Sequence, residues 1–251
     1  MKTNWKIKLG IVLLLVSLIV YLIAYFNLHD PDKVIFHLVV DLAFMPLDVL
    51  LVVLFVEGII NKKEKEKSME KMDMITSVFF SKIGTVILSK LSTLDINMDK
   101  IQHIVENIGK WSEKDFKKFL KEFKNSDYGF YLERGYSIEQ EFFIELQKFL
   151  IEKRDFLIRL IENPSLMEKD NFSNLILGIL HLDDELEKRD FEKPITKPDY
   201  NHLIIDISRV YSSLIYEWVS YLHYIKIHYP YMFSIAIRTN PFDSNADIYV
   251  K

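Results

Sequence analysis

Two long apolar runs within the first sixty residues constrain this chain more than any other feature. Residues 9–28 (LGIVLLLVSLIVYLIAYFNL) carry no charged side chain, and residues 34–60 (VIFHLVVDLAFMPLDVLLVVLFVEGII) carry few polar ones. A helix needs about twenty residues to cross the hydrocarbon core of a bilayer, at about 1.5 Å rise per residue. Both runs meet this length. The sequence therefore predicts two transmembrane helices, spanning about 9–28 and 34–60, that form a membrane anchor over residues 1–60.

The charges that flank the two runs predict how the spans are oriented. Lysines lie before the first run and after the second, whereas the turn between the runs carries two aspartates and one lysine. Positively charged loops stay on the cytoplasmic side. We therefore expect a multi-pass protein of the cell (inner or plasma) membrane with both termini in the cytoplasm. A cleaved signal peptide is the alternative for the first run, but no small-residue cleavage motif follows it.

The rest of the chain has the composition of a water-soluble helical domain. The formal net charge is −4 and no cysteine is present. The charge gives no positive field for nucleic acid, so no nucleic-acid partner is expected. The missing cysteines exclude disulfides, thiol nucleophiles and cysteine-ligated zinc. Few glycines and prolines and long amphipathic runs predict a mostly α fold, in which the two transmembrane helices are followed by a cytoplasmic bundle of five or six helices.

The predicted domain order follows from where the composition changes. Residues 61–73 (NKKEKEKSMEKMD) alternate in charge and form a charged neck, which we expect to be a solvated helix. The alternative is that its lysines bind anionic lipid headgroups. Residues 74–240 form the cytoplasmic helical domain, and residues 241–251 form a tail. No glycine or proline interrupts the chain between residues 61 and 83, so one nearly continuous helix is expected to join the second span to the domain.

Within this domain, helical spacing and capping residues predict the individual helices. A buried stripe is expected at helical spacing across the start of the domain, at Met72, Ile75, Phe79, Ile83 and Val86. Ser112 and Asp115 have the spacing of a capping box. Another long helix follows Ser137 and ends before Pro164, and the last long helix runs from about Pro198 to Tyr229, before Pro230. The runs IDISRVY and FSIAI have strand-like composition but lie within helical registers.

Three stretches resemble a family of uncharacterised two-span membrane proteins of prokaryotes. They are VDLAFMPLDVLLVVLFVEGII at 40–60, MDMITSVFFSKIGT at 72–85 and YLHYIKIHYPYMFSIAIRTNPFD at 221–243. These stretches fall in both halves of the chain, so the resemblance extends over its whole length. It implies two membrane spans with a helical cytoplasmic domain, and it brings no assigned activity, ligand or catalytic residue.

Polar side chains inside the second span are candidates for a function in the membrane. His37, Asp41 and Asp48 are offset by four and seven residues, which places them near one face of a helix. Three interpretations stand: they hold spans or protomers together, they lie in the interface, or they form an ion path. Asp48 lies near the middle of the bilayer, where an unpaired carboxylate costs roughly 2.5–3.5 kcal/mol. The first span offers it few polar partners, so we expect a homo-oligomer.

A second set of candidates lies in the helical domain. His181 and Glu185 share one predicted helix, and His202 and Asp206 share the next. Imidazole and carboxylate groups on facing helices can bind a metal ion. The alternative is a structural network in which Arg189 and Arg209 pair with the acidic side chains.

The sequence favours a non-enzymatic role. No phosphate-binding loop, nucleophile elbow, HExxH motif or dinucleotide turn is present, and no cofactor is expected. The leading hypothesis is a membrane-anchored helical interaction, sensor or scaffold module, with the lipid bilayer as one partner and a protein partner unidentified. The alternative is a metal-dependent enzyme that uses His181, Glu185, His202 and Asp206.

Overall fold

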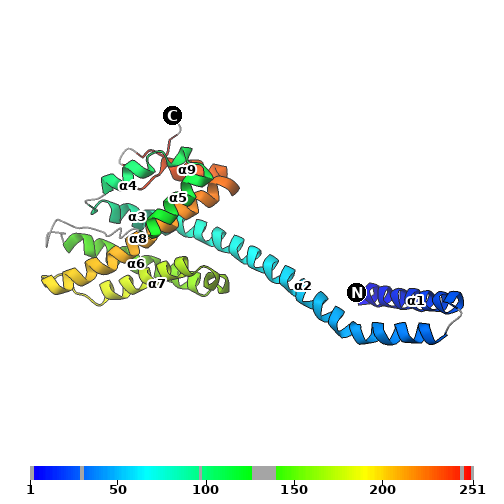
Figure 1. Cartoon of the computed structure of the whole chain (residues 1–251). Coiled ribbons are helices and arrows are strands. Elements are labelled where there is room, and N and C mark those ends of the chain that lie inside the picture. Colours follow the sequence, from blue (N-terminus) through cyan, green and yellow to red (C-terminus); the bar gives the residue numbers. More distant parts are fainter. Residues whose placement is uncertain (1–2, 29–30, 96–97, 126–139, 244–245, 250–251) are drawn as a thin grey trace. The chain divides into compact units, whose positions relative to one another are not determined.

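The computed structural model describes residues 3–28, 31–95, 98–125, 140–243 and 246–249. Within these ranges every regular element is a helix, and the prediction of a mostly α protein is confirmed. The chain divides into two compact units, unit 1 (Met1–Glu64) and unit 2 (Lys65–Lys251). Figure 1 shows the helices of each unit.

Unit 1 consists of α1 (Thr3–Leu28) and the first part of α2 (Pro31–Phe79). One run of the described residues, Asp32–Ser92, is long and apolar enough to cross a membrane by length and composition. Its most apolar window has a mean hydropathy of 2.5 and no buried residue. The described side chains of α1 form a shorter apolar stretch, Ile11–Phe26. Length and composition thus identify one candidate span here, and the span expected at 9–28 stays a prediction.

Helix α2 continues without a break through the charged neck into unit 2 (Figure 1). Unit 2 then contains a π-helical turn, η1, two 3₁₀ turns, η2 and η3, and seven further α-helices among its described residues. Their bounds are η1 Phe80–Gly84, α3 Thr85–Ser92, α4 Met98–Val105, η2 Ile108–Lys110, α5 Glu113–Lys124, α6 Gln140–Ile161, η3 Pro164–Glu168, α7 Asp170–Glu187, α8 Lys197–His228 and α9 Pro230–Arg238.

Helix α8 is the central element of unit 2. It packs against α3, α5, α7 and α9, and α6 packs against α7. Fully buried side chains such as Tyr211, Leu214 and Trp218 recur along α8 at helical spacing, as expected for a helix enclosed by others. Fixed by these contacts, α7 and α8 carry most of the candidate functional side chains.

The predicted helix boundaries in unit 2 depend on prolines and caps, and most are confirmed. Ser112 and Asp115 form the expected capping box at the start of α5. Pro198 lies in the first turn of α8, and Pro230 begins α9, which includes the strand-like run FSIAI. The boundary predicted at Ser137 lies outside the described residues.

The π-helical turn η1 lets two consecutive aromatic rings enter the core. The backbone N–H and the hydroxyl of Thr85 both donate to the carbonyl oxygen of Phe80, five residues earlier. Phe79 packs edge-on against Phe172, and Phe80 stacks on Tyr221 at a ring-centroid distance of 5.2 Å.

The same turn shifts the buried face of the helix by one residue. The predicted stripe is confirmed at Met72, Phe79 and Ile83, which are buried. It is wrong at Val86, which is exposed, because the wider turn brings Ile87 onto the buried face instead.

Gly84 provides the test of this packing. A Cβ atom at Gly84 would lie 2.5 Å from Cε1 of Phe79 and 2.7 Å from Cδ1 of Phe80, both of which are buried rings. We expect Gly84→Ala to lower the free energy of unfolding by about 1–3 kcal/mol, because the rings must move within a filled core. Urea unfolding of the full chain in detergent, followed by tryptophan fluorescence, measures this.

Gly178→Ala is the matched control for Gly84→Ala. Gly178 lies within α7, and a Cβ atom there would meet Cγ2 of Val210 at 3.5 Å, an ordinary contact. Since alanine favours the helix over glycine, this variant should be neutral or slightly stabilising. Equal losses of stability in the two variants would contradict the account of η1.

Candidate functional site

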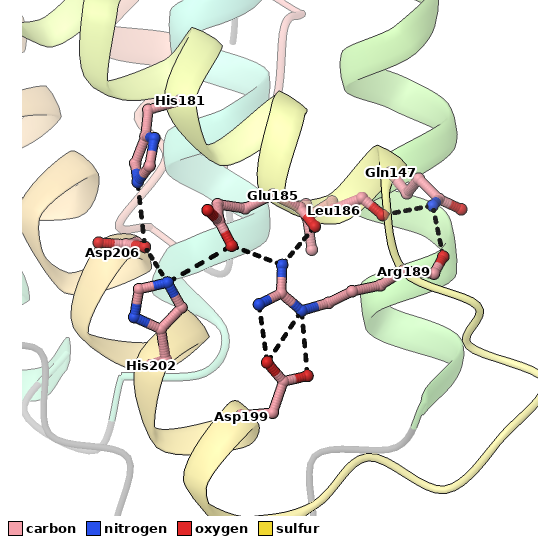
Figure 2. A network of polar contacts seen from close by, with 8 residues as sticks. All are labelled: Gln147, His181, Glu185, Leu186, Arg189, Asp199, His202 and Asp206. Atoms are coloured by element: carbon pink, nitrogen blue, oxygen red, sulfur yellow. Dashed lines mark hydrogen bonds and ion pairs between the residues drawn. The ribbon is translucent and has the colours of Figure 1, made fainter.

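The four candidate residues of the helical domain come together on adjacent turns of α7 and α8. We call His181, Glu185, His202 and Asp206 the α7–α8 cluster (Figure 2). Nε2 of His181 lies 3.5 Å from Oδ2 of Asp206, and Nε2 of His202 lies 3.4 Å from the same oxygen. Nε2 of His202 also lies 3.4 Å from Oε2 of Glu185. The spacing of four residues on each helix and the packing of α7 on α8 bring these groups together.

Burial differs sharply between the members of the α7–α8 cluster. The Asp206 side chain is 4% exposed, whereas both imidazoles are about half exposed. The two histidines therefore cover a carboxylate that α8 holds almost out of solvent. Such a carboxylate needs nearby donors or cations to compensate for its lost hydration.

Arg189 ties the α7–α8 cluster to the connection between the two helices. Its Nη1 lies 2.6 Å from Oε2 of Glu185, and Nε and Nη2 both bond the Asp199 carboxylate, at 3.0 and 2.7 Å. Hydrogen bonds from Arg189 lower the pKa of Glu185 and of Asp199. Gln147, on α6, donates to the carbonyl oxygens of Leu186 and Arg189 and so holds this end of α7 (Figure 2).

The arrangement of these arginines bears on the metal hypothesis. Arg189 forms an ion pair with Oε2 of Glu185, and Nη1 of Arg209 lies 3.2 Å from Oδ1 of Asp206. Both carboxylates therefore already have a cationic partner. Among the described side chains, no group of three or more His, Asp or Glu residues is arranged to hold a metal ion. The geometry thus supports the structural network more than the metal-dependent enzyme, which stays a prediction.

The polar residues of the second predicted span do not form one site in unit 1. The hydroxyl of Tyr21, on α1, donates to Oδ2 of Asp41 at 2.7 Å. His37 lies edge-on to the ring of Phe36. Asp48 is exposed, and no hydrogen bond or ion pair involves it among the described residues. Sequence reasoning did not predict the pairing of Tyr21 with Asp41.

Sequence reasoning also missed a partly buried ion triad of Asp73, Lys169 and Glu217. Nζ of Lys169 lies 3.2 Å from Oε2 of Glu217 and 3.4 Å from Oδ1 of Asp73. Glu217 is 1% exposed, and burial raises its pKa despite the neighbouring ammonium group. The available signal was an acid at a core position of α8, between Leu214 and Trp218.

Glu217 also lines a cavity of about 310 Å³ between α5, α7 and α8, which we call the Glu217 pocket. Its lining residues are Phe123, Lys124, Asn171, Asn174, Ser212, Ser213, Tyr216 and Glu217. Burial and the charge of Glu217 raise the pKa of Tyr216. The pocket thus combines a buried acid with amide and hydroxyl groups, the mixture that small-molecule sites use to orient a ligand.

Arg189 tests how much the polar network contributes to stability. We expect Arg189→Met to lower the free energy of unfolding by about 1–2 kcal/mol, because two carboxylates lose a forked partner. Arg189→Lys should recover little of this loss, since an ammonium group cannot bond Asp199 in the same way. Arg209→Met is the control: its side chain is 75% exposed against 20% for Arg189, and we expect a loss below about 0.5 kcal/mol.

The effect of Arg189→Met should depend on pH. The folded-state pKa values of Glu185 and Asp199 are lowered, so their stabilisation is present above the unfolded-state pKa, about 4, and is lost as the pH falls through the folded-state values. The difference in unfolding free energy between parent and variant should therefore shrink below about pH 4. A difference that stays constant into acid would show that packing, not charge, explains the loss.

Comparisons with known proteins divide the chain as its two helical units do. Residues 1–60 match the family described as MJ1433, N-terminal helical domain, and residues 68–238 match Uncharacterized protein MJ1433, C-terminal helical domain. Uncharacterized protein MJ1433 of Methanocaldococcus jannaschii is 34% identical over 245 residues, which cover 98% of this chain and 96% of the relative. No solved structure matches the chain. The chain belongs to the MJ1433 family of helical proteins.

Proposed function

We propose that this protein is a membrane-anchored helical sensor or interaction module. In this proposal α1 and the apolar part of α2 insert in the cell membrane. The helical domain lies in the cytoplasm and binds a ligand or a partner there. The lysines that flank both apolar runs support cytoplasmic termini, by the positive-inside rule.

The observation that carries the proposal is the exposure of apolar side chains along both helices of unit 1. Leu14 on α1 is 73% exposed and Phe55 on α2 is 71% exposed, and their apolar neighbours are similarly open. Each large apolar side chain left in water forgoes roughly 1.5–3 kcal/mol of burial free energy. Such a continuous apolar surface fits a lipid environment rather than water.

The sensor role is supported by the way α2 enters the core of unit 2. Met72 and Phe79, near the end of α2, are fully buried in the helical domain. Asp73, between them, pairs with Lys169, which pairs with Glu217 on α8. The helix that carries the predicted second span therefore also contributes packing and charge next to the Glu217 pocket.

Membrane extraction tests the anchor. We expect the full chain to stay with the membrane fraction in alkaline carbonate and to enter solution only with detergent. The double variant Leu50→Lys with Val53→Lys should lose much of this retention, because each charge inside a span costs roughly 2.5–3.5 kcal/mol.

The matched control places the same two charges on exposed apolar positions of unit 2, Leu177→Lys with Ile205→Lys. This variant should be retained like the parent. Release of the parent by carbonate would contradict the membrane anchor.

Asp48 tests whether the spans associate. An unpaired carboxylate near the middle of a bilayer is more stable against protein than against lipid. We infer that a second copy of the same span supplies this protein surface. We expect Asp48→Leu to keep membrane insertion but to weaken self-association, measured as oligomer distribution across protein-to-lipid ratios.

Asp41→Leu is the control for Asp48→Leu. Asp41 already accepts a hydrogen bond from Tyr21 of the same chain, so its loss should leave the oligomer distribution near that of the parent. If Asp48→Leu and the parent give the same distribution, assembly through Asp48 is wrong.

A further inference from the structure

We infer that the Glu217 pocket binds a small neutral molecule with several hydroxyl groups, of the size of one sugar ring. This inference supplies a ligand class for the proposed sensor and rests on that proposal only for its biological role. The pocket itself lies wholly within unit 2.

Among the described residues, Glu217 carries an acceptor, Oε1, without a hydrogen-bonding partner. Glu217 is buried; among the described residues its Oε2 is paired only with the ammonium group of Lys169, and its Oε1 has no hydrogen bond. Buried polar atoms are almost always hydrogen-bonded, and an exception at the wall of a cavity points to a missing donor. A ligand hydroxyl is such a donor.

The remaining wall of the pocket carries groups that suit a polyol. Asn171 and Asn174 come from the first turns of α7, and Ser213 and Tyr216 come from α8. Amides and hydroxyls can both donate and accept hydrogen bonds, as the hydroxyl groups of a polyol do. Phe123 adds an apolar face, against which the C–H groups of a sugar ring can pack.

The balance of charge at the pocket favours a neutral ligand. Glu217 and Asp73 are acidic, and Lys169 and Lys124 are basic, so the four groups at or next to the pocket carry no net charge when ionised. A cationic or anionic ligand would bring an uncompensated charge against a partly buried wall. A neutral ligand avoids this cost.

The volume of the pocket limits the size of the ligand. The volume of about 310 Å³ lies at the lower end of the range of about 300–1,000 Å³ found for small-molecule sites. It suits a single ring rather than a nucleotide or a lipid chain.

The test compares three probes that share one ring: D-glucose, D-glucosamine and D-glucuronate, which are neutral, cationic and anionic. Saturation-transfer NMR is recorded on the full chain in a detergent without a sugar headgroup. We expect millimolar binding of D-glucose and markedly weaker binding of both charged sugars. Stronger binding of either charged sugar, or no binding of D-glucose, would overturn the inference.

Variants locate the binding in the pocket. Asn174→Ala should weaken D-glucose binding about fivefold, as expected for one lost hydrogen bond. The matched control, Asn201→Ala, changes an exposed asparagine of α8 outside the pocket and should leave binding unchanged.

Glu217→Gln separates a neutral ligand from a cation. Glutamine keeps the acceptor but not the charge, so D-glucose should bind within about twofold of the parent.

Equal binding of D-glucose by the Asn174→Ala and Asn201→Ala variants would place the sugar outside the pocket and overturn the inference. All of these measurements are made in detergent, so their outcome does not depend on whether the membrane anchor is correct.

Discussion

The apolar surface of α1 and of the first part of α2 is the constraint from which the account of this protein begins. The two helices give each other little cover, and within unit 1 their leucine, valine and phenylalanine side chains stay open along the described length. Water would penalise this surface by many times the few kcal/mol that separate folded from unfolded states. A lipid environment, as proposed, would remove this penalty, and polar groups such as Asp41 and Asp48 would then become the expensive ones. Asp41 has Tyr21 as a partner, and we propose that a second copy of the chain supplies one for Asp48.

The helical domain has a different requirement, because the end of the long helix α2 is buried in its core. The π-helical turn η1 seats Phe79 and Phe80 side by side against α7 and α8. The triad of Asp73, Lys169 and Glu217 then joins α2, η3–α7 and α8 through charges that are largely removed from solvent. Buried charges often contribute little net stability, and we propose that this triad instead favours one arrangement of the three segments. We regard this junction, next to the Glu217 pocket, as the place where ligand binding and the position of α2 would be linked.

Much of this could be predicted from local sequence, and the failures share a cause. Pro198, Pro230 and the Ser112 capping box act within a few residues, so they marked helix ends correctly. The spacing of four residues brought His181, Glu185, His202 and Asp206 together, but sequence could not decide between a metal ion and the arginines that pair with them. The π-helical shift at Val86 and the pairing of Glu217 depend on what α7 and α8 present to α2. Such tertiary contacts override helical periodicity, and the residues that make them are far apart along the chain.

Site-specific cysteine labelling tests the central claim most directly, since the chain has no cysteine of its own. Single substitutions Asp32→Cys, Leu50→Cys and Ser68→Cys are treated in intact cells with a membrane-impermeant maleimide and again after permeabilisation. The account predicts labelling of the Asp32 variant in intact cells, labelling of the Ser68 variant only after permeabilisation, and no labelling of the Leu50 variant in either case. Labelling of the Ser68 variant in intact cells, or of the Leu50 variant in the membrane fraction, would contradict it.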